Sequence, residues 1–159
     1  MQNNSLEKIV ISTGVGKLRD NAKFADQIMP EITQEFGLIA GQKAALRTAK
    51  ISIAGFKVRE GDTIGLTVTL RGKKMKDFLA RLINITLPRV RDFRGIDLKN
   101  FDAKGNLTIG IKDHNVFSEI DSEKCRTNFG LQITFVADLK NKQEGIGFFR
   151  ELGLPLMKQ

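Results

Sequence analysis

Apolar and polar residues alternate most regularly over residues 62–70, DTIGLTVTL. Successive side chains of a strand point to opposite faces of a sheet, so this segment predicts a strand with one buried face and one threonine-rich polar face. Four other runs rich in β-branched and apolar residues predict further strands. These runs are 6–13, 43–48, 106–111 and 130–137.

A spacing of four residues between apolar side chains predicts a helix in the first third of the chain. The apolar residues are Phe24, Ile28, Ile32 and Phe36. The helix would begin at Asp20 or Asn21, whose short polar side chains can cap it. Pro30 is expected to kink or shorten it, because proline lacks a backbone N–H. Gly37 and Gly41 are expected to end it.

Two more helices are expected nearer the C-terminus. Between residues 73 and 86, apolar residues recur from Met75 at i, i+3, i+4, i+7 and i+8, and Pro88 is expected to end this helix. A short helix is expected from about Lys142 to Leu152. Strands and helices mix without a regular βαβ repeat. This order predicts one α+β domain over residues 1–159, with an antiparallel or mixed sheet and helices packed on one face.

The charge is positive and unevenly distributed. The 159 residues include 26 Lys and Arg against 18 Asp and Glu, a formal net charge of +8 with an isoelectric point near 9.8. Residues 71–94 hold eight basic and two acidic side chains, so this segment alone has a net charge of +6. Such a basic stripe attracts polyanions, which favours nucleic acid as a partner. A solvated helix face is the alternative.

Composition argues against several classes of protein. One cysteine cannot form a disulfide framework or a cysteine-rich zinc site, and one histidine leaves little for acid–base chemistry. No apolar run approaches the ~20 residues that a membrane helix needs. The start, MQNNSLEKIV, lacks the basic and apolar regions of a secretory signal, so a cytoplasmic protein without a membrane partner is expected.

Candidate catalytic and metal-binding residues are few, and each has a simpler explanation. Residues 14–17, GVGK, lack the upstream glycine and following serine or threonine of a phosphate-binding loop, so a strand-ending turn is expected. His114 has no second histidine with which to share a metal, so a surface polar residue is expected rather than a ligand or general base. Cys125 lies between Lys124 and Arg126, which would lower its pKa, but an unreactive thiol is expected because no base accompanies it. The sequence therefore predicts no enzyme, no metal and no cofactor.

Three features together favour RNA as the nucleic acid. The basic segment supplies phosphate contacts, and the threonine face over residues 62–70 offers hydroxyls to sugars and base edges, with Gln42 and Lys43 as further candidates. Phe56 lies in a loop between two glycines, where it can pack on an exposed base or sugar. Packing in the core is the alternative role for Phe56, because its side chain is apolar.

Long segments of the chain resemble one protein family. TAKISIAGFKVREGDTIGLTVTLRG (48–72), MKDFLARLINITLPRVRDFRG (75–95) and FDAKGNLTIGIKDHNVFSEID (101–121) resemble the bacterial-type large-subunit ribosomal protein five, as do LEKIVISTGVG (6–16) and ELGLPL (151–156). The resemblance implies an α+β protein that binds 5S rRNA in the central protuberance of the large subunit. It also implies contacts with 23S rRNA, peptidyl-site tRNA, neighbouring large-subunit proteins and a basic small-subunit protein across an intersubunit bridge.

The resemblance also implies roles for individual residues. The rRNA-binding residues would be Ser12, Thr13, Gly14, Gln42, Lys43, Thr67, Thr69, Arg71, Arg89, Arg91 and Arg94. The last three arginines, from PRVRDFRG, would either hold RNA phosphates or brace the fold. The loop that faces tRNA would comprise Ser52, Ile53, Ala54, Gly55, Phe56 and Lys57.

The bridge to the small subunit would fall between Phe117 and Arg126 by the same resemblance. Glu119, Asp121 and Glu123 form an acidic group there that could meet basic residues of a partner. The group lacks the spacing of a calcium loop, and solvated surface is the alternative interpretation.

Three features depart from the family's pattern. The family usually has one more helix before the first strand, whereas five residues precede Leu6 here. Ser12 and Thr13 replace an Asn-Met pair, so hydroxyls would replace an amide contact to RNA. Lys17 stands where the family often has an acid, which adds positive charge near the expected RNA surface.

Two other functions are weighed against the ribosomal one. An enzyme of nucleotide or RNA metabolism would need an acid–base pair, and the sequence offers none. A free RNA chaperone or regulator would use the same surface away from the ribosome. Co-sedimentation with large subunits separates that function from the ribosomal one.

Overall fold

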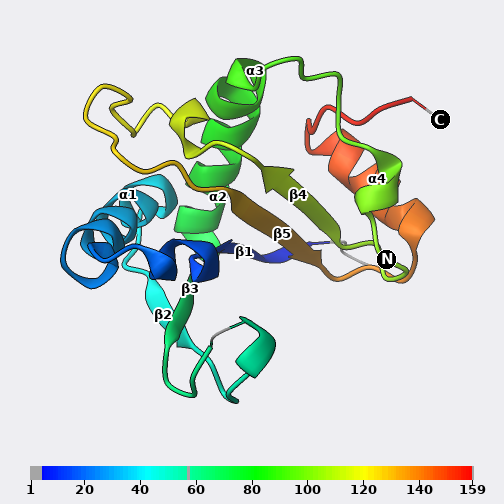
Figure 1. Ribbon diagram of the computed structural model, residues 1–159. Helices are drawn as coiled ribbons and strands as arrows, with labels where there is room; N and C mark the ends of the chain where they lie inside the picture. Colours follow the sequence, from blue (N-terminus) through cyan, green and yellow to red (C-terminus); the bar gives the residue numbers. More distant parts are fainter. Residues whose placement is uncertain (1–4, 57, 159) are drawn as a thin grey trace.

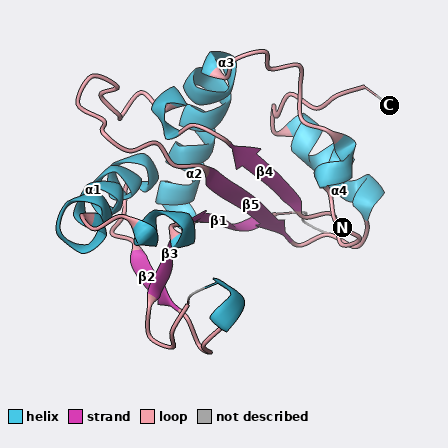
Figure 2. Ribbon diagram, viewed as in Figure 1, coloured by secondary structure: helices cyan, strands magenta, loops and turns pink. Residues whose placement is uncertain are grey.

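The computed structural model describes residues 5–56 and 58–158, apart from the side chains of Asp20 and Phe56. Its centre is a five-stranded sheet with the order β2-β3-β1-β5-β4, and all neighbouring strands are antiparallel (Figure 1, Figure 2). The strands are β1 (Leu6–Gly14), β2 (Ala45–Thr48), β3 (Thr63–Leu70), β4 (Leu107–Ile111) and β5 (Leu131–Ala137). The five predicted strands are confirmed, and so is the α+β fold class.

The register gives the sheet one buried face and one open face. Ile11 of β1 lies opposite Val68 of β3 and Ile133 of β5, and all three side chains are buried in the core. The next residue, Ser12, lies opposite Thr67 on the other face. Because side chains alternate along a strand, apolar rows face the helices and polar rows face away from them.

The first helix begins and ends later than the sequence predicts. A 3-10 turn (Gly16–Asp20) and a π turn (Phe24–Ile28) precede α1 (Met29–Ala40). Pro30 lies in the first turn of α1, but Ile28 and Met29 before it are already helical, so the helix runs on through the proline and changes there from π-helical to α-helical hydrogen bonding. Gly41 ends the helix in the left-handed conformation with φ of 73°, as predicted, whereas Gly37 lies within it.

The helix predicted over residues 73–86 continues past the proline that was expected to end it. It comprises α2 (Gly72–Arg81), a π turn (Leu82–Thr86) and α3 (Leu87–Arg89). Pro88 again follows a π turn within a continuous helical run, which ends one residue later at Arg89, and the chain becomes extended at Val90. Met75, Phe78 and Leu82 are buried in the core, as their spacing predicted.

The last helix, α4 (Lys142–Glu151), confirms the predicted helix over residues 142–152. Its N-terminus is capped by the Asn141 side chain, which accepts a hydrogen bond from the backbone N–H of Glu144 at 3.0 Å. Phe149 packs against Phe135 on the buried face of β5, with ring centroids 5.8 Å apart. The helices therefore cover the same face of the sheet. Among the described residues, no helix is long and apolar enough to span a membrane.

One segment projects away from the two-layer body (Figure 1). Residues 49–62 connect β2 to β3, and we call this segment the finger. At its base, the N–H of Ala49 donates to the carbonyl of Asp62 at 2.8 Å. Further out, Ile53 and Val58 exchange two backbone hydrogen bonds of 2.8 and 3.1 Å. The finger is thus an extension of the β2–β3 hairpin.

Candidate nucleic-acid interface

The open face of the sheet carries polar side chains across β3, β1, β5 and β4. They are Ser12, Thr67, Thr69, Thr108, Gln132 and Thr134. Ser12 lies at the centre, opposite Thr67 on one side and Gln132 on the other. No described helix covers this face, and hydroxyl and amide groups both donate and accept hydrogen bonds. The face is therefore suited to sugar hydroxyls and base edges.

The residues of β4 and β5 on this face were not among the sequence-predicted site residues. Gln132 and Thr134 alternate with buried Leu131, Ile133 and Phe135, which is the same pattern that revealed the threonine face of β3. The signal was therefore present in the sequence. Only the pairing register shows that the polar residues of β3 and β5 lie on the same face of the sheet as Ser12 of β1.

Three other predicted residues lie at the margin of the open face, near the end of β3. The Nε2 atom of Gln42 donates to the backbone carbonyl of Thr69 at 3.4 Å, which holds the connection after α1 against β3. Lys43 follows directly and is exposed, and Arg71 is exposed immediately after β3. Two cations therefore border the hydroxyl groups, where they can meet phosphates.

Thr13 lies on the buried side of the sheet, away from this face. Its side chain is opposite Leu66 and is buried, and its hydroxyl donates to the carbonyl of Gly130 at 2.6 Å. That hydrogen bond joins the end of β1 to the start of β5. Gly14 follows in an exposed position at the end of β1, opposite Gly65. The structure therefore leaves Ser12 and Gly14 on the open face but turns Thr13 inward.

The three arginines of PRVRDFRG lie away from the open face, with Arg89 at the end of α3 and the other two on the segment after it. Arg89, Arg91 and Arg94 are all exposed. Between them, Asp92 has a positive φ of 55°, which turns the chain sharply. Within residues 5–56 and 58–158, none of the three arginines forms an ion pair or a side-chain hydrogen bond. Their side chains are therefore available to phosphates and do not brace the described fold through polar contacts.

The loop predicted to face tRNA forms the outer part of the finger. Ser52, Ile53, Ala54 and Gly55 are exposed. The Ser52 hydroxyl accepts a hydrogen bond from the backbone N–H of Glu60 at 3.0 Å, and Ile53 is 41% exposed. The side chain of Phe56 and all of Lys57 lie outside the described residues. The finger therefore presents apolar surface to solvent.

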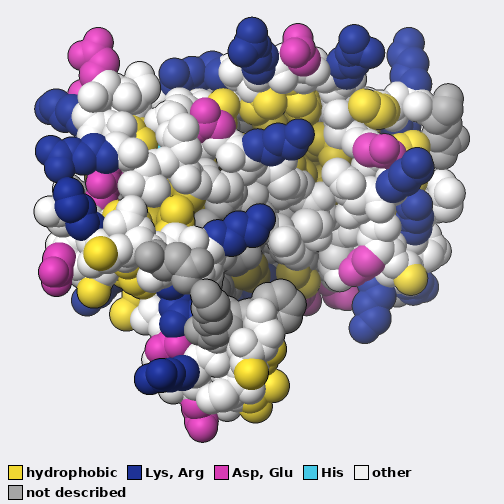
Figure 3. Space-filling model, in the orientation of Figure 1, with side chains coloured by type: hydrophobic (Ala, Val, Ile, Leu, Met, Phe, Trp, Pro, Cys, Tyr) yellow, Lys and Arg dark blue, Asp and Glu magenta, His cyan; other side chains and the backbone are white. Residues whose placement is uncertain are grey.

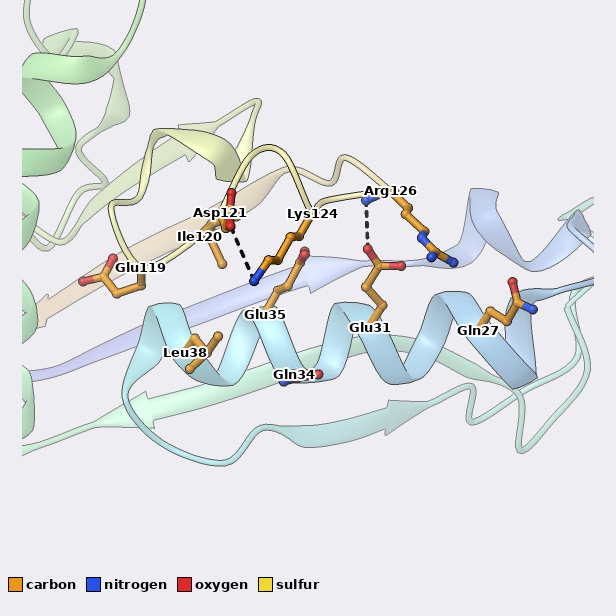
Figure 4. A pocket seen from close by; sticks show the side chains of 10 residues that line it. All are labelled: Gln27, Glu31, Gln34, Glu35, Leu38, Glu119, Ile120, Asp121, Lys124 and Arg126. Atoms are coloured by element: carbon orange, nitrogen blue, oxygen red, sulfur yellow. Dashed lines mark hydrogen bonds and ion pairs between the residues drawn. The ribbon is translucent and has the colours of Figure 1, made fainter.

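Two acids of the group predicted for the bridge, Glu119 and Asp121, border a pocket against α1 (Figure 4). The pocket has a volume of about 480 Å³. Glu119 accepts a hydrogen bond from Arg81, and the Asp121 carboxylate lies 3.9 Å from the ammonium group of Lys124. Glu123 is exposed in the same segment. Of the three acids, Asp121 and Glu123 are thus the ones that face solvent.

His114 is fully buried, which corrects the expectation of a surface residue. Its Nε2 lies 2.8 Å from Oε2 of Glu35 in α1 and 3.1 Å from Sγ of Cys125. Its ring stacks on Phe129 at 4.0 Å between centroids, and Nδ1 accepts from the N–H of Phe129 at 3.4 Å. Nε2 therefore carries the proton and donates to Glu35. Local sequence could not show this, because Glu35 lies 79 residues away.

The pKa of the Cys125 thiol is raised from 9.0 to about 11. Burial and the Glu35 carboxylate both favour the neutral thiol, so the lowering expected from Lys124 and Arg126 is wrong. A neutral thiol fits the predicted lack of reactivity. Possible metal-ligand atoms of Glu35, His114 and Cys125 lie within 4.8 Å of one another. These three side chains also contact one another within hydrogen-bonding distance, and so the cluster joins α1 to residues 113–129.

Comparison with known proteins decides the family. The family model described as Ribosomal protein L5 matches residues 1–59, and the model for the C-terminus of the same ribosomal family matches residues 63–156. The chain belongs to the ribosomal protein L5 family. The two matched segments share one sheet, because β3 of the second segment lies between β1 and β2 of the first.

Curated relatives of the L5 family resemble the chain over nearly its whole length. Large ribosomal subunit protein uL5 of Geotalea daltonii is 50% identical over 155 residues, which make up 98% of this chain and 84% of that protein. The uL5 protein of Leuconostoc mesenteroides is 48% identical over 158 residues, covering 99% and 86% of the two chains. The uL5c protein of Paulinella chromatophora is 45% identical over 148 residues, covering 93% and 80%.

Membership of the L5 family makes this chain a structural component of the large ribosomal subunit and not an enzyme. It places the protein in the ribosome, among rRNA and other ribosomal proteins, and so confirms the predicted cytoplasmic location. The basic segment over residues 71–94 and the uncovered polar face fit such surroundings, because rRNA presents both phosphates and sugar hydroxyls.

Proposed function

We propose that this L5 protein binds 5S rRNA in the central protuberance through the open face of its sheet. The observation that carries the proposal is the continuous set of hydroxyl and amide groups across four strands, centred on Ser12 and uncovered by any described helix. Lys43 and Arg71 at the margin supply phosphate contacts. Recognition then depends on the shape and sugars of the RNA more than on sequence.

The finger is the proposed contact with peptidyl-site tRNA. It projects from the body beyond the β2–β3 hairpin and exposes apolar side chains such as Ile51, which is 66% exposed. Apolar side chains on a projecting loop can pack against the exposed bases and sugars of a folded RNA. This role is separate from the open face, because the finger continues the hairpin away from the residues around Ser12.

Two other surfaces complete the proposal. Arg89, Arg91 and Arg94 are assigned to rRNA phosphates, with 23S rRNA as a further partner, because all three are exposed and make no ion pair with the described residues. Asp121 and Glu123 are assigned to the bridge with a basic small-subunit protein, because their carboxylates face solvent on a chain whose net charge is +8.

A salt titration with labelled 5S rRNA tests the main proposal. The protein has no Trp and no Tyr, so the label belongs on the RNA. We expect selective binding that persists at physiological salt in the presence of tRNA and an unrelated RNA duplex as competitors. Equal affinity for all three RNAs that collapses as salt rises would reduce the protein to a basic domain with nonspecific affinity.

A further inference from the structure

A second pocket lies beside β4, on the side of the sheet that the helices cover. It has a volume of about 360 Å³ and opens between β4 and the segment after α3. Its apolar lining consists of buried Leu87, Ile109 and Ile111 and partly exposed Val90, Phe93 and Val116. In Figure 3, an apolar strip bordered by basic side chains occupies the region where Figure 1 shows α3 and the segment after it.

The rim of this pocket is mainly cationic. Arg89, Arg91 and Lys112 line it, and all three are exposed. The acid at the rim, Asp113, uses one carboxylate oxygen to accept a hydrogen bond from the backbone N–H of Asn115 at 3.0 Å. An apolar floor under several cations fits a flat apolar group attached to an anionic chain. An aliphatic peptide would match the apolar floor but not the cations, and an acidic peptide would match the cations but not the floor.

The backbone of β4 adds polar groups to the same pocket. β4 is an edge strand, and Ile109, Gly110 and Ile111 line the pocket. Within residues 5–56 and 58–158, the outer edge of β4 is bridged to Phe101 at Leu107 and pairs with no strand beyond it, so the N–H and C=O groups over residues 109–111 can meet the hydrogen-bonding edge of a ligand. The volume lies near the lower end of the range of about 300–1,000 Å³ for small-molecule sites, the size class of a nucleoside.

We propose that this pocket takes one unstacked nucleobase of single-stranded rRNA, whose flanking phosphates contact Arg89, Arg91 and Lys112. The base lies on Phe93 and the apolar floor, and the edge of β4 meets its polar edge. The inference rests on the proposed contact of the PRVRDFRG arginines with rRNA and adds the chemical group that they position. The site is separate from the open face, because Ile109 and Ile111 point to the buried side of the sheet.

A tryptophan in the pocket provides a direct test, because the chain has none of its own. Phe93→Trp is titrated with RNA pentamers that differ only at the central position, which is A, C, G, U or abasic. We expect at least one base to quench the emission and to bind at least about fivefold more tightly than the abasic pentamer, as for base stacking on an aromatic ring. Phe148→Trp, on partly exposed α4 surface outside the pocket, is the matched control and should not respond.

Two more measurements keep the outcome decisive. Arg89→Ala with Arg91→Ala should weaken pentamer binding without changing the preference for a base over the abasic site. If Phe93→Trp unfolds, a fluorescent 2-aminopurine at the central position reports on the unchanged protein. Equal binding of the abasic and all four intact pentamers, or equal quenching in both tryptophan variants, would overturn the pocket. Selective 5S rRNA binding, measured in parallel, would show that the proposed role of the open face stands even if the proposed base site does not.

Discussion

Arg81 of α2 and Glu119 are joined by a hydrogen bond of 2.5 Å from Nη1 to Oε1. The same guanidinium lies 5.8 Å from the ring centroid of Phe78, and its Nη2 is 3.5 Å from the carbonyl oxygen of Ile39 at the end of α1. One side chain therefore connects α2, α1 and the acidic segment. Glu119 is paired within the molecule and Asp121 lies 3.9 Å from the ammonium group of Lys124, so Glu123 is the acid of this group that forms no ion pair with a described residue.

Reversing the charge of Glu123 should loosen the bridge between the subunits. We expect Glu123→Lys to weaken association of large and small subunits, with the largest effect at low salt, because exposed charges are screened as salt rises. Light scattering of purified subunits measures the association. Glu151→Lys, an exposed position on α4, is the control for the same change in net charge. The same loss in both variants would argue against a bridge role for residues 117–126.

Removing hydroxyls from the open face should weaken 5S rRNA binding. Ser12→Ala combined with Thr67→Val keeps the strand shape but deletes two neighbouring hydroxyls, and we expect a loss of roughly 1–3 kcal/mol of binding free energy. Filter binding with labelled 5S rRNA measures it. Thr33→Val removes a hydroxyl that bonds within α1 to Met29 and should leave the affinity unchanged. Full affinity in a folded double variant would show that these two hydroxyls do not contact the 5S rRNA.

Gly65 is required for the close approach of β1 and β3. A Cβ at this position would lie 2.7 Å from the backbone oxygen of Thr13, closer than real Cβ contacts allow. We expect Gly65→Ala to lower the free energy of unfolding by about 1–3 kcal/mol, because the strands must shift to accommodate it. Urea denaturation followed by far-ultraviolet circular dichroism measures the change. Gly110→Ala in β4, where an added Cβ meets no atom within 4 Å, should cost far less.

An apolar-to-polar change on the finger should separate tRNA contact from 5S rRNA binding. Ile53→Ser alters a side chain that is 41% exposed and leaves the backbone pair with Val58 intact. We expect unchanged 5S rRNA affinity but weaker retention of peptidyl-site tRNA by reconstituted ribosomes. If 5S rRNA affinity falls as far as in the Ser12 and Thr67 double variant, the finger belongs to the 5S surface.

The raised pKa of Cys125 predicts slow alkylation and a loss of stability in alkali. With the pKa near 11 in the folded state and 9.0 otherwise, iodoacetamide should modify the native thiol at pH 8 at least about tenfold more slowly than the unfolded one. The folded state holds the thiol proton more tightly, so stability is full below pH 9 and falls as pH rises toward 11. Cys125→Ser should remove part of this fall, and identical profiles would contradict it.

Hydrophobic periodicity predicted the elements because each pattern is local. Alternation along β3 and the spacing from Met75 in α2 depend only on which face of an element is buried. The helix ends were harder to predict, because the effect of a proline depends on where the helix starts. Pro30 and Pro88 both lie just after a π turn inside a continuous helical run, so the chain tolerates each proline through a local change of hydrogen bonding that the sequence does not show.

The candidate site was predicted only in part, for a different reason. Thr13 and Thr67 look equally polar in the sequence, and only the register turns one inward and the other outward. His114 was misplaced because its partner Glu35 lies on a distant helix. Contacts between residues far apart in the chain have no local signature, whereas the resemblance of whole segments to the L5 family supplied the function directly.

The strand order has a consequence for how the protein folds during its synthesis. β1 pairs with β3 and β5, and the hydroxyl of Thr13 bonds to the carbonyl of Gly130, 117 residues later. The backbone edge of β1 that faces β5 therefore stays unpaired until most of the chain has been translated. Such non-local pairing slows folding and exposes strand edges in the nascent chain. We expect stalled nascent chains that end before β5 to be protease-sensitive and chaperone-bound, with a compact fold appearing only once residue 137 has emerged.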